Sequence, residues 1–61
     1  MAEITSKELT SLSDLMTSEQ LMITKYKDYA TTTTDPALKT KYEQIAAKHQ
    51  QHFDMLFSHL K

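Results

Sequence analysis

Hydrophobic side chains recur every three or four positions along two stretches of the chain, a spacing typical of amphipathic helices. The pattern predicts one helix from about residue 5 to 32, a turn at 33–35 and a second helix from about 36 to 60. The positions that share one face are Leu9, Leu12, Met16, Glu19, Ile23, Tyr26 and Ala30, followed by Leu38, Tyr42, Ile45, His49, His52, Leu56 and His59. We therefore predict an all-α chain in which residues 1–61 form a single antiparallel hairpin.

Local signals at the helix ends agree with this division. Thr5 is followed three positions later by Glu8, which is the spacing of a capping box at a helix start. The threonines at 31–34 have β-branched side chains, which lower helix propensity. Asp35 followed by Pro36 then predicts a new helix, because the carboxylate caps free amides and proline suits the first helical position.

The register of the two stripes also favours a hairpin. Residues that are equally far from Thr34 in the sequence should face each other across a turn centred there. Tyr26 then faces Tyr42, Glu19 faces His49, and Met16 faces His52. Every residue of one stripe meets a residue of the other, and the two predicted helices have similar lengths.

A hairpin of this size leaves much of its hydrophobic surface in water. Burial within one hairpin does not offset an ordering entropy of roughly 1.5 kcal/mol per residue. The simplest way to bury this surface is a two-fold homodimer, which would give a ferritin-like four-helix bundle. A trimer and a heteromeric partner remain alternatives. A second seam for such packing is predicted from the flanking residues Leu15, Met22, Tyr29, Phe53 and Phe57.

Composition excludes several classes of protein. Seven basic and eight acidic residues provide no basic face, so nucleic-acid binding is not expected. The chain has no glycine for a phosphate-binding loop and no cysteine for a disulfide or thiolate site. Its longest unbroken apolar runs are three residues, so no membrane span is expected, and Met1 to Thr10 lacks the features of a signal peptide. These observations agree with a cytoplasmic protein.

Three polar residues interrupt the apolar stripes. Glu19 lies at the middle of the first stripe and faces His49, while His52 lies one turn further along the second. A carboxylate and two imidazoles at this spacing form a candidate metal site for a divalent ion such as zinc or iron. In a dimer, two such sets would gather near the bundle centre. The alternative is a hydrogen-bonded ion pair that fixes the register of the helices. No nucleophile pairs with a histidine by spacing, so catalysis is not expected.

Residues 19–30 and 42–53 resemble the first two metal-binding helices of rubrerythrin-type ferritin-like proteins. In that family a Glu precedes a Tyr by seven positions, as Glu19 precedes Tyr26 here. The second helix of the family carries an aromatic-x-x-Ile-Ala pattern and then Glu-x-x-His. The resemblance implies that Glu19 corresponds to a carboxylate ligand and His52 to a histidine ligand. His49 stands where the family has a bridging Glu, which implies zinc or another divalent ion rather than di-iron chemistry.

A second resemblance extends over most of the chain. It is carried by the segments at 7–9, 25–30, 34–36 and 48–52, which look like small proteins related to the Coat F spore-coat family of endospore-forming Firmicutes. Those proteins are helical and ferritin-like, with a structural or unknown role. The resemblance implies a spore-coat protein that is made in the mother cell and contacts other coat proteins.

Three functions are compatible with these features. The first is a structural or assembly protein that acts as a homodimer. The second is a metal-binding protein with ligands Glu19, His49 and His52. The third is a helical adaptor whose exposed seam receives the helices of a partner.

Overall fold

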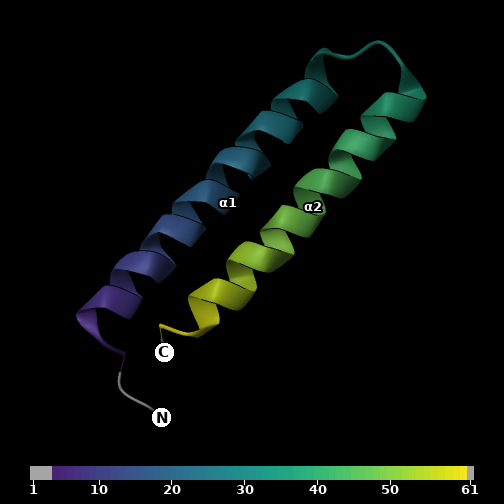
Figure 1. Cartoon of the computed structure of the whole chain (residues 1–61). Coiled ribbons are helices and arrows are strands. Elements are labelled where there is room, and N and C mark those ends of the chain that lie inside the picture. The colour runs from purple at the N-terminus through teal and green to yellow at the C-terminus, as the bar shows by residue number, and fades with distance from the viewer. Residues whose placement is uncertain (1–3, 61) are drawn as a thin grey trace.

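The computed structural model describes residues 4–60 as two antiparallel helices that lie side by side (Figure 1). Helix α1 spans Ser6–Thr32 and helix α2 spans Pro36–Ser58. No strand occurs between residues 4 and 60, so the predicted all-helical hairpin is confirmed. Residues 1–3 and 61, which the predicted hairpin also included, lie outside the described part of the chain.

The helix ends carry the predicted caps. The Thr5 hydroxyl accepts a hydrogen bond from the Glu8 amide at 3.1 Å, and Glu8 Oε1 accepts one from the Thr5 amide at 3.1 Å. At the start of α2, Asp35 Oδ1 accepts hydrogen bonds from the amides of Ala37 and Leu38 at 2.8 and 3.2 Å. These contacts satisfy amide groups that have no partner within the helix, so each helix begins at a defined residue.

The second helix ends two residues before the predicted limit. The amides of His59 and Leu60 donate to the carbonyls of Leu56 and Phe57, three positions earlier, at 3.1 and 3.0 Å. This tighter pattern is typical of the last turn of a helix, where carbonyl groups would otherwise be left unpaired. The hydrophobic stripe continues through this turn, which explains why the sequence alone placed the end at about residue 60.

Few side chains of the hairpin are buried. Among residues 4–60, the buried hydrophobic residues are Leu12, Ile23, Ala30 and Ala46, and two of these four are alanines. The molecule measures 47 × 17 × 10 Å, so it is a single layer about one helix thick. Such a layer has no interior in which a second row of hydrophobic side chains can be buried.

The register of the helices follows the prediction at two levels. The rings of Tyr26 and Tyr42 lie with centroids 6.1 Å apart, and Glu19 contacts His49. His52 contacts Glu19 as well, with its Nδ1 3.1 Å from Glu19 Oε2. Helical side chains lean toward the N-terminus of their own helix. In an antiparallel pair, Glu19 and His52 therefore lean toward each other and close the gap of one turn.

The predicted second seam is divided between two sides of the hairpin. Met22 and Tyr29 immediately precede the buried residues Ile23 and Ala30, whereas Ser13 immediately follows the buried Leu12. Because successive helical residues are about 100° apart, Met22 and Tyr29 lie on one side of α1 and Ser13 on the other. Phe53 lines the same hollow as Ser13, so it lies on the side opposite Met22 and Tyr29. The five predicted seam residues therefore do not form one surface.

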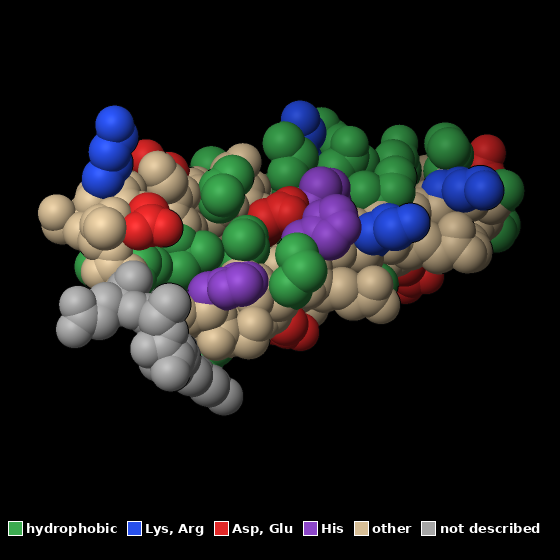
Figure 2. All heavy atoms as spheres, turned by 60° about the horizontal axis from the view of Figure 1, so that its bottom comes forward, with side chains coloured by type: hydrophobic (Ala, Val, Ile, Leu, Met, Phe, Trp, Pro, Cys, Tyr) green, Lys and Arg blue, Asp and Glu red, His purple; other side chains and the backbone are tan. Residues whose placement is uncertain are grey.

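We call the first side the tyrosine–histidine face. Tyr29 contacts Tyr26 and Tyr42 there, at ring-centroid distances of 5.7 and 5.3 Å. Figure 2 shows histidine and acidic side chains beside one another, with hydrophobic side chains gathered along the molecule next to them. We define this face by the residues Leu15, Glu19, Met22, Tyr26, Tyr29, Leu38, Tyr42, Ile45, His49 and His52.

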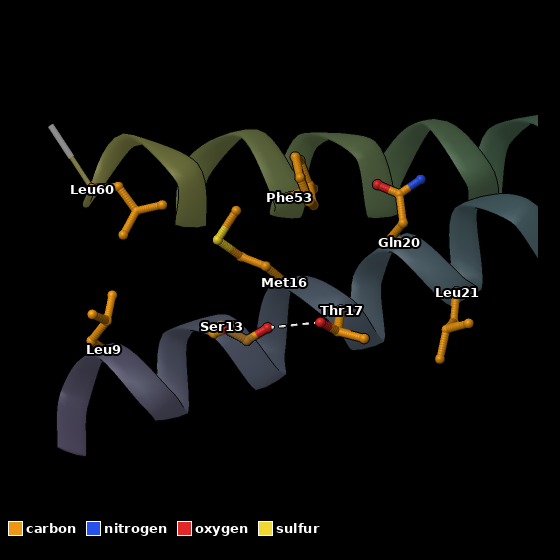
Figure 3. Close-up of a pocket in the computed structure, with 8 residues that line it drawn as sticks. All are labelled: Leu9, Ser13, Met16, Thr17, Gln20, Leu21, Phe53 and Leu60. Atoms are coloured by element: carbon orange, nitrogen blue, oxygen red, sulfur yellow. Dashed lines mark hydrogen bonds between the residues drawn. The ribbon is translucent and has the colours of Figure 1, made fainter. Parts of the chain in front are cut away.

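We call the opposite side the groove face. Near the chain ends it contains an open hollow of about 590 Å³ lined by Leu9, Met16, Phe53 and Leu60, among others (Figure 3). The Met16 side chain points from α1 toward α2 between Phe53 and Leu60 (Figure 3). Nearer the turn the same side is lined by polar and small residues, which include Lys27, Lys39, Glu43, Ala47 and Gln50.

Neither helix between residues 4 and 60 combines the length and apolar character that crossing a bilayer requires.

Candidate functional site

The hairpin brings the three predicted ligand residues together. Glu19 lies at the middle of α1, while His49 and His52 are one turn apart on α2. Residues three positions apart share one side of a helix, so both imidazoles point toward α1. All three side chains come from a single chain, and their contacts need no second copy of the hairpin.

The Glu19 carboxylate bridges the two imidazoles. Its Oε1 lies 2.6 Å from Nδ1 of His49, and its Oε2 lies 3.1 Å from Nδ1 of His52. His49 Nδ1 is also 3.5 Å from Oε2, so the shorter contact dominates. Each carboxylate oxygen thus has its own imidazole partner, and both partners belong to the other helix.

The protonation of the group follows from this geometry. An ionised carboxylate can only accept hydrogen bonds, so each Nδ1 must carry the proton that it donates to Glu19. The hydrogen bond from His49 is the main reason why the pKa of Glu19 lies below its ordinary value of 4.5. Burial acts in the opposite direction, and the charge of His49 and the contact with His52 add to the lowering of the pKa.

The three side chains differ in their access to water. The exposed fraction of the side chain is 17% for Glu19, 26% for His49 and 48% for His52. The carboxylate is thus the most enclosed member, and His52 forms the open side of the group. A solute reaches the site past His52.

Aromatic rings hold His49 in place. The Tyr26 ring stacks on the His49 imidazole with an interplanar angle of 10° and a centroid distance of 6.1 Å. The His52 imidazole packs edge-on against the His49 imidazole, with an interplanar angle of 90° and a centroid distance of 5.7 Å. Tyr26 in turn contacts Tyr29 and Tyr42. The orientation of His49 is therefore fixed by ring contacts as well as by its hydrogen bond.

The contact of Tyr26 with the site was not predicted from the sequence, which placed this residue opposite Tyr42. A signal for it was present, because Tyr26 lies seven positions after Glu19 and hence two turns along the same side of α1. His59, the third histidine, lies at the end of α2 and makes no contact with the group.

The arrangement offers three metal-ligand atoms at close range. One ligand atom each from Glu19, His49 and His52 can be chosen so that all three lie within 4.8 Å of one another. Two imidazoles and one carboxylate are the protein ligands of several zinc and non-haem iron sites. As it stands, the group is a hydrogen-bonded bridge between two helices, and its donor set suits a divalent cation.

No known protein family, curated protein or solved structure matches the chain.

Proposed function

We propose that this protein is a small structural or assembly protein that acts as a homodimer, in which two hairpins pack into a four-helix bundle. The observation that carries the proposal is the large hydrophobic surface that one hairpin leaves in water. Monomeric proteins rarely expose extended apolar patches, and such patches are typical of interfaces. The exposed large hydrophobic residues of the described chain are Ile4, Leu9, Leu15, Leu21, Tyr29, Leu38, Met55, Phe57 and Leu60.

The tyrosine–histidine face is the better candidate for the interface. Leu15, Met22 and Tyr29 follow one another at intervals of seven on α1, and Leu38, Ile45 and His52 do so on α2. Such intervals keep side chains in one row along a helix, which suits packing against a second pair of helices. On the groove face, the half nearer the turn is lined by charged residues, among them Lys27, Lys39 and Glu43.

The size of the hairpin is sufficient for a stable interface. A standard interface buries about 800 Å² on each partner. The hairpin has a total accessible surface of 4866 Å², so about one sixth of it would be covered. A two-fold axis near the middle of the face requires only one self-complementary surface.

The resemblance of several short segments to spore-coat proteins supports a role in a larger protein assembly. Within that proposal, the dimer is the building unit, and the groove face remains available for other coat proteins. An assembly subunit needs exposed surfaces of this kind and needs no catalytic group.

The experiment that tests the dimer compares two matched charge substitutions by sedimentation equilibrium. Leu38 and Leu21 are exposed by 44% and 65%, but Leu38 lies on the tyrosine–histidine face, fourteen positions before His52, whereas Leu21 borders the hollow of the groove face. We expect the wild-type chain and the Leu21→Glu variant to be dimers at micromolar concentration. The Leu38→Glu variant should dissociate at a concentration at least about tenfold higher than the wild type, because it places a charge in the apolar interface.

A wild-type chain that stays monomeric and helical over the whole concentration range would overturn the proposal. Equal weakening by Leu38→Glu and Leu21→Glu would show that the tyrosine–histidine face is not the interface. A hairpin that is monomeric alone but forms a stable complex with other helical proteins would instead be an adaptor.

A further inference from the structure

We propose that Glu19, His49 and His52 of one chain form a complete site for a single divalent cation, with two imidazoles and one carboxylate as ligands. The inference goes beyond the assembly function, since it needs neither a dimer nor a residue from a second copy. It rests on the position of the three side chains within one hairpin.

The distances between the ligand atoms are close to those of a bound site. Zinc holds nitrogen and oxygen ligands at about 2.0–2.1 Å in a tetrahedral arrangement, so neighbouring ligand atoms are about 3.3 Å apart. Glu19 Oε2 and His52 Nδ1 are already 3.1 Å apart. The same oxygen lies 3.5 Å from His49 Nδ1. One ligand atom of each residue can be chosen so that all three lie within 4.8 Å of one another, and rotation of the imidazoles about their side-chain bonds would bring them to the shorter separation of a bound site.

Binding requires a defined transfer of protons. Each Nδ1 that donates to Glu19 gives up its proton when it takes the metal. A neutral imidazole moves that proton to Nε2, so the ring remains neutral. An imidazolium ring releases a proton to solvent and keeps the other on Nε2. In both cases the carboxylate stays ionised and bonds directly to the cation.

The donor set selects the class of cation. Imidazole nitrogens suit zinc, cobalt, nickel and ferrous iron, whereas calcium and magnesium prefer a shell of oxygen atoms. One carboxylate leaves a net positive charge on a bound divalent ion. In the single hairpin the His52 side chain is 48% exposed, so water or a small anion could complete the coordination shell there.

The neighbouring rings favour a site that is formed before the cation arrives. Tyr26 stacks on His49 at an interplanar angle of 10°, and this contact limits the rotation of the imidazole. Glu19 is held by hydrogen bonds from both histidines. Little ordering of side chains is therefore left for the binding step, and such preorganisation increases affinity.

The test is a titration of the untagged, chelator-treated protein with cobalt(II), whose visible absorption reports its ligands. We expect one cobalt per chain, displaced by an equal amount of zinc. Glu19→Gln and His52→Ala should each weaken cobalt binding more than about tenfold. His59→Ala removes a histidine outside the group and should bind cobalt like the wild type.

The stoichiometry in a monomeric background separates this proposal from the dimer. Leu38→Glu lies eleven positions from His49, away from the ligands, and should bind one cobalt per chain even where it sediments as a monomer. One cobalt per two chains, or loss of binding in that variant, would overturn a site within one chain. Absence of cobalt binding by the wild type, or equal binding by Glu19→Gln, would overturn the site itself. Glu19→Gln keeps the shape of the side chain, and its far-ultraviolet circular dichroism checks that the helices are retained.

Discussion

Glu19 and His49 are thirty residues apart in the sequence, yet the carboxylate Oε1 and the imidazole Nδ1 lie 2.6 Å from each other at the middle of the hairpin. The contact joins the two helices at one level. A slip of one helical turn would displace the partners by about 5.4 Å and break it. The bridge therefore links the register of the fold to the candidate metal site, because the same side chains serve both.

The first prediction concerns the tautomers of the histidines in the metal-free protein. Because Glu19 accepts from both rings, nitrogen-15 NMR should show that the neutral imidazoles of His49 and His52 carry their proton on Nδ1. His59 has no contact with Glu19 and is the internal control. A spectrum in which His49 and His52 have the same tautomer populations as His59 would contradict the hydrogen-bonded bridge.

The second prediction concerns the small core. Ile23 is 3% exposed, and truncation to alanine leaves a cavity between the helices. We expect Ile23→Ala to lower the free energy of unfolding by about 2–5 kcal/mol at a fixed protein concentration. Leu21→Ala is the matched control, since Leu21 is 65% exposed. Urea denaturation followed by circular dichroism measures both, and equal losses in the two variants would mean that Ile23 is not buried.

The third prediction concerns the start of α2. Asp35 Oδ1 accepts hydrogen bonds from Ala37 and Leu38, and alanine cannot replace this cap. Asp35→Ala should lower the free energy of unfolding by about 1 kcal/mol, whereas Asp35→Asn should lose much less because asparagine caps helices about equally well. Thermal unfolding of both variants tests this. A similar loss in both would point to the charge of Asp35 rather than to its hydrogen bonds.

Much of the hairpin is encoded by local patterns. The capping box at Thr5 and Glu8 and the Asp35–Pro36 start are short-range signals, so the sequence predicts where the helices begin. The contacts of Tyr26 with Tyr42 and of Glu19 with His49 follow from equal distances to Thr34. Two helices of similar length that are joined by a short turn can pack against each other in few other registers, which is why these pairs could be predicted.

Features that depend on side-chain direction could not be predicted in the same way. Residue spacing placed His52 opposite Met16, but the lean of helical side chains brings it to Glu19. Spacing also grouped Phe53 with Tyr29, although Phe53 lines the groove on the other side. Both differences arise because a sequence stripe gives the face of one helix and not the angle at which two helices meet.

The last prediction concerns the response of α1 to acid. The hydrogen bonds with Thr5 hold the pKa of Glu8 below its ordinary value of 4.5. A carboxyl with a lowered pKa in the folded state contributes stability above its unfolded pKa, and this contribution is lost as the pH falls through the folded value. We therefore expect the first turn of α1 to fray below about pH 4.5 in the metal-free protein.

Amide hydrogen exchange at Glu8 and Leu9 measures that fraying, because the amides of both residues are bonded to Thr5. Glu8→Gln is the matched variant, since a glutamine can still accept from the Thr5 amide but has no carboxyl group to titrate. Protection of these amides should therefore change much less with pH in Glu8→Gln than in the wild type. If both proteins lose protection at the same pH, the acid response comes from another carboxylate and not from the capping box.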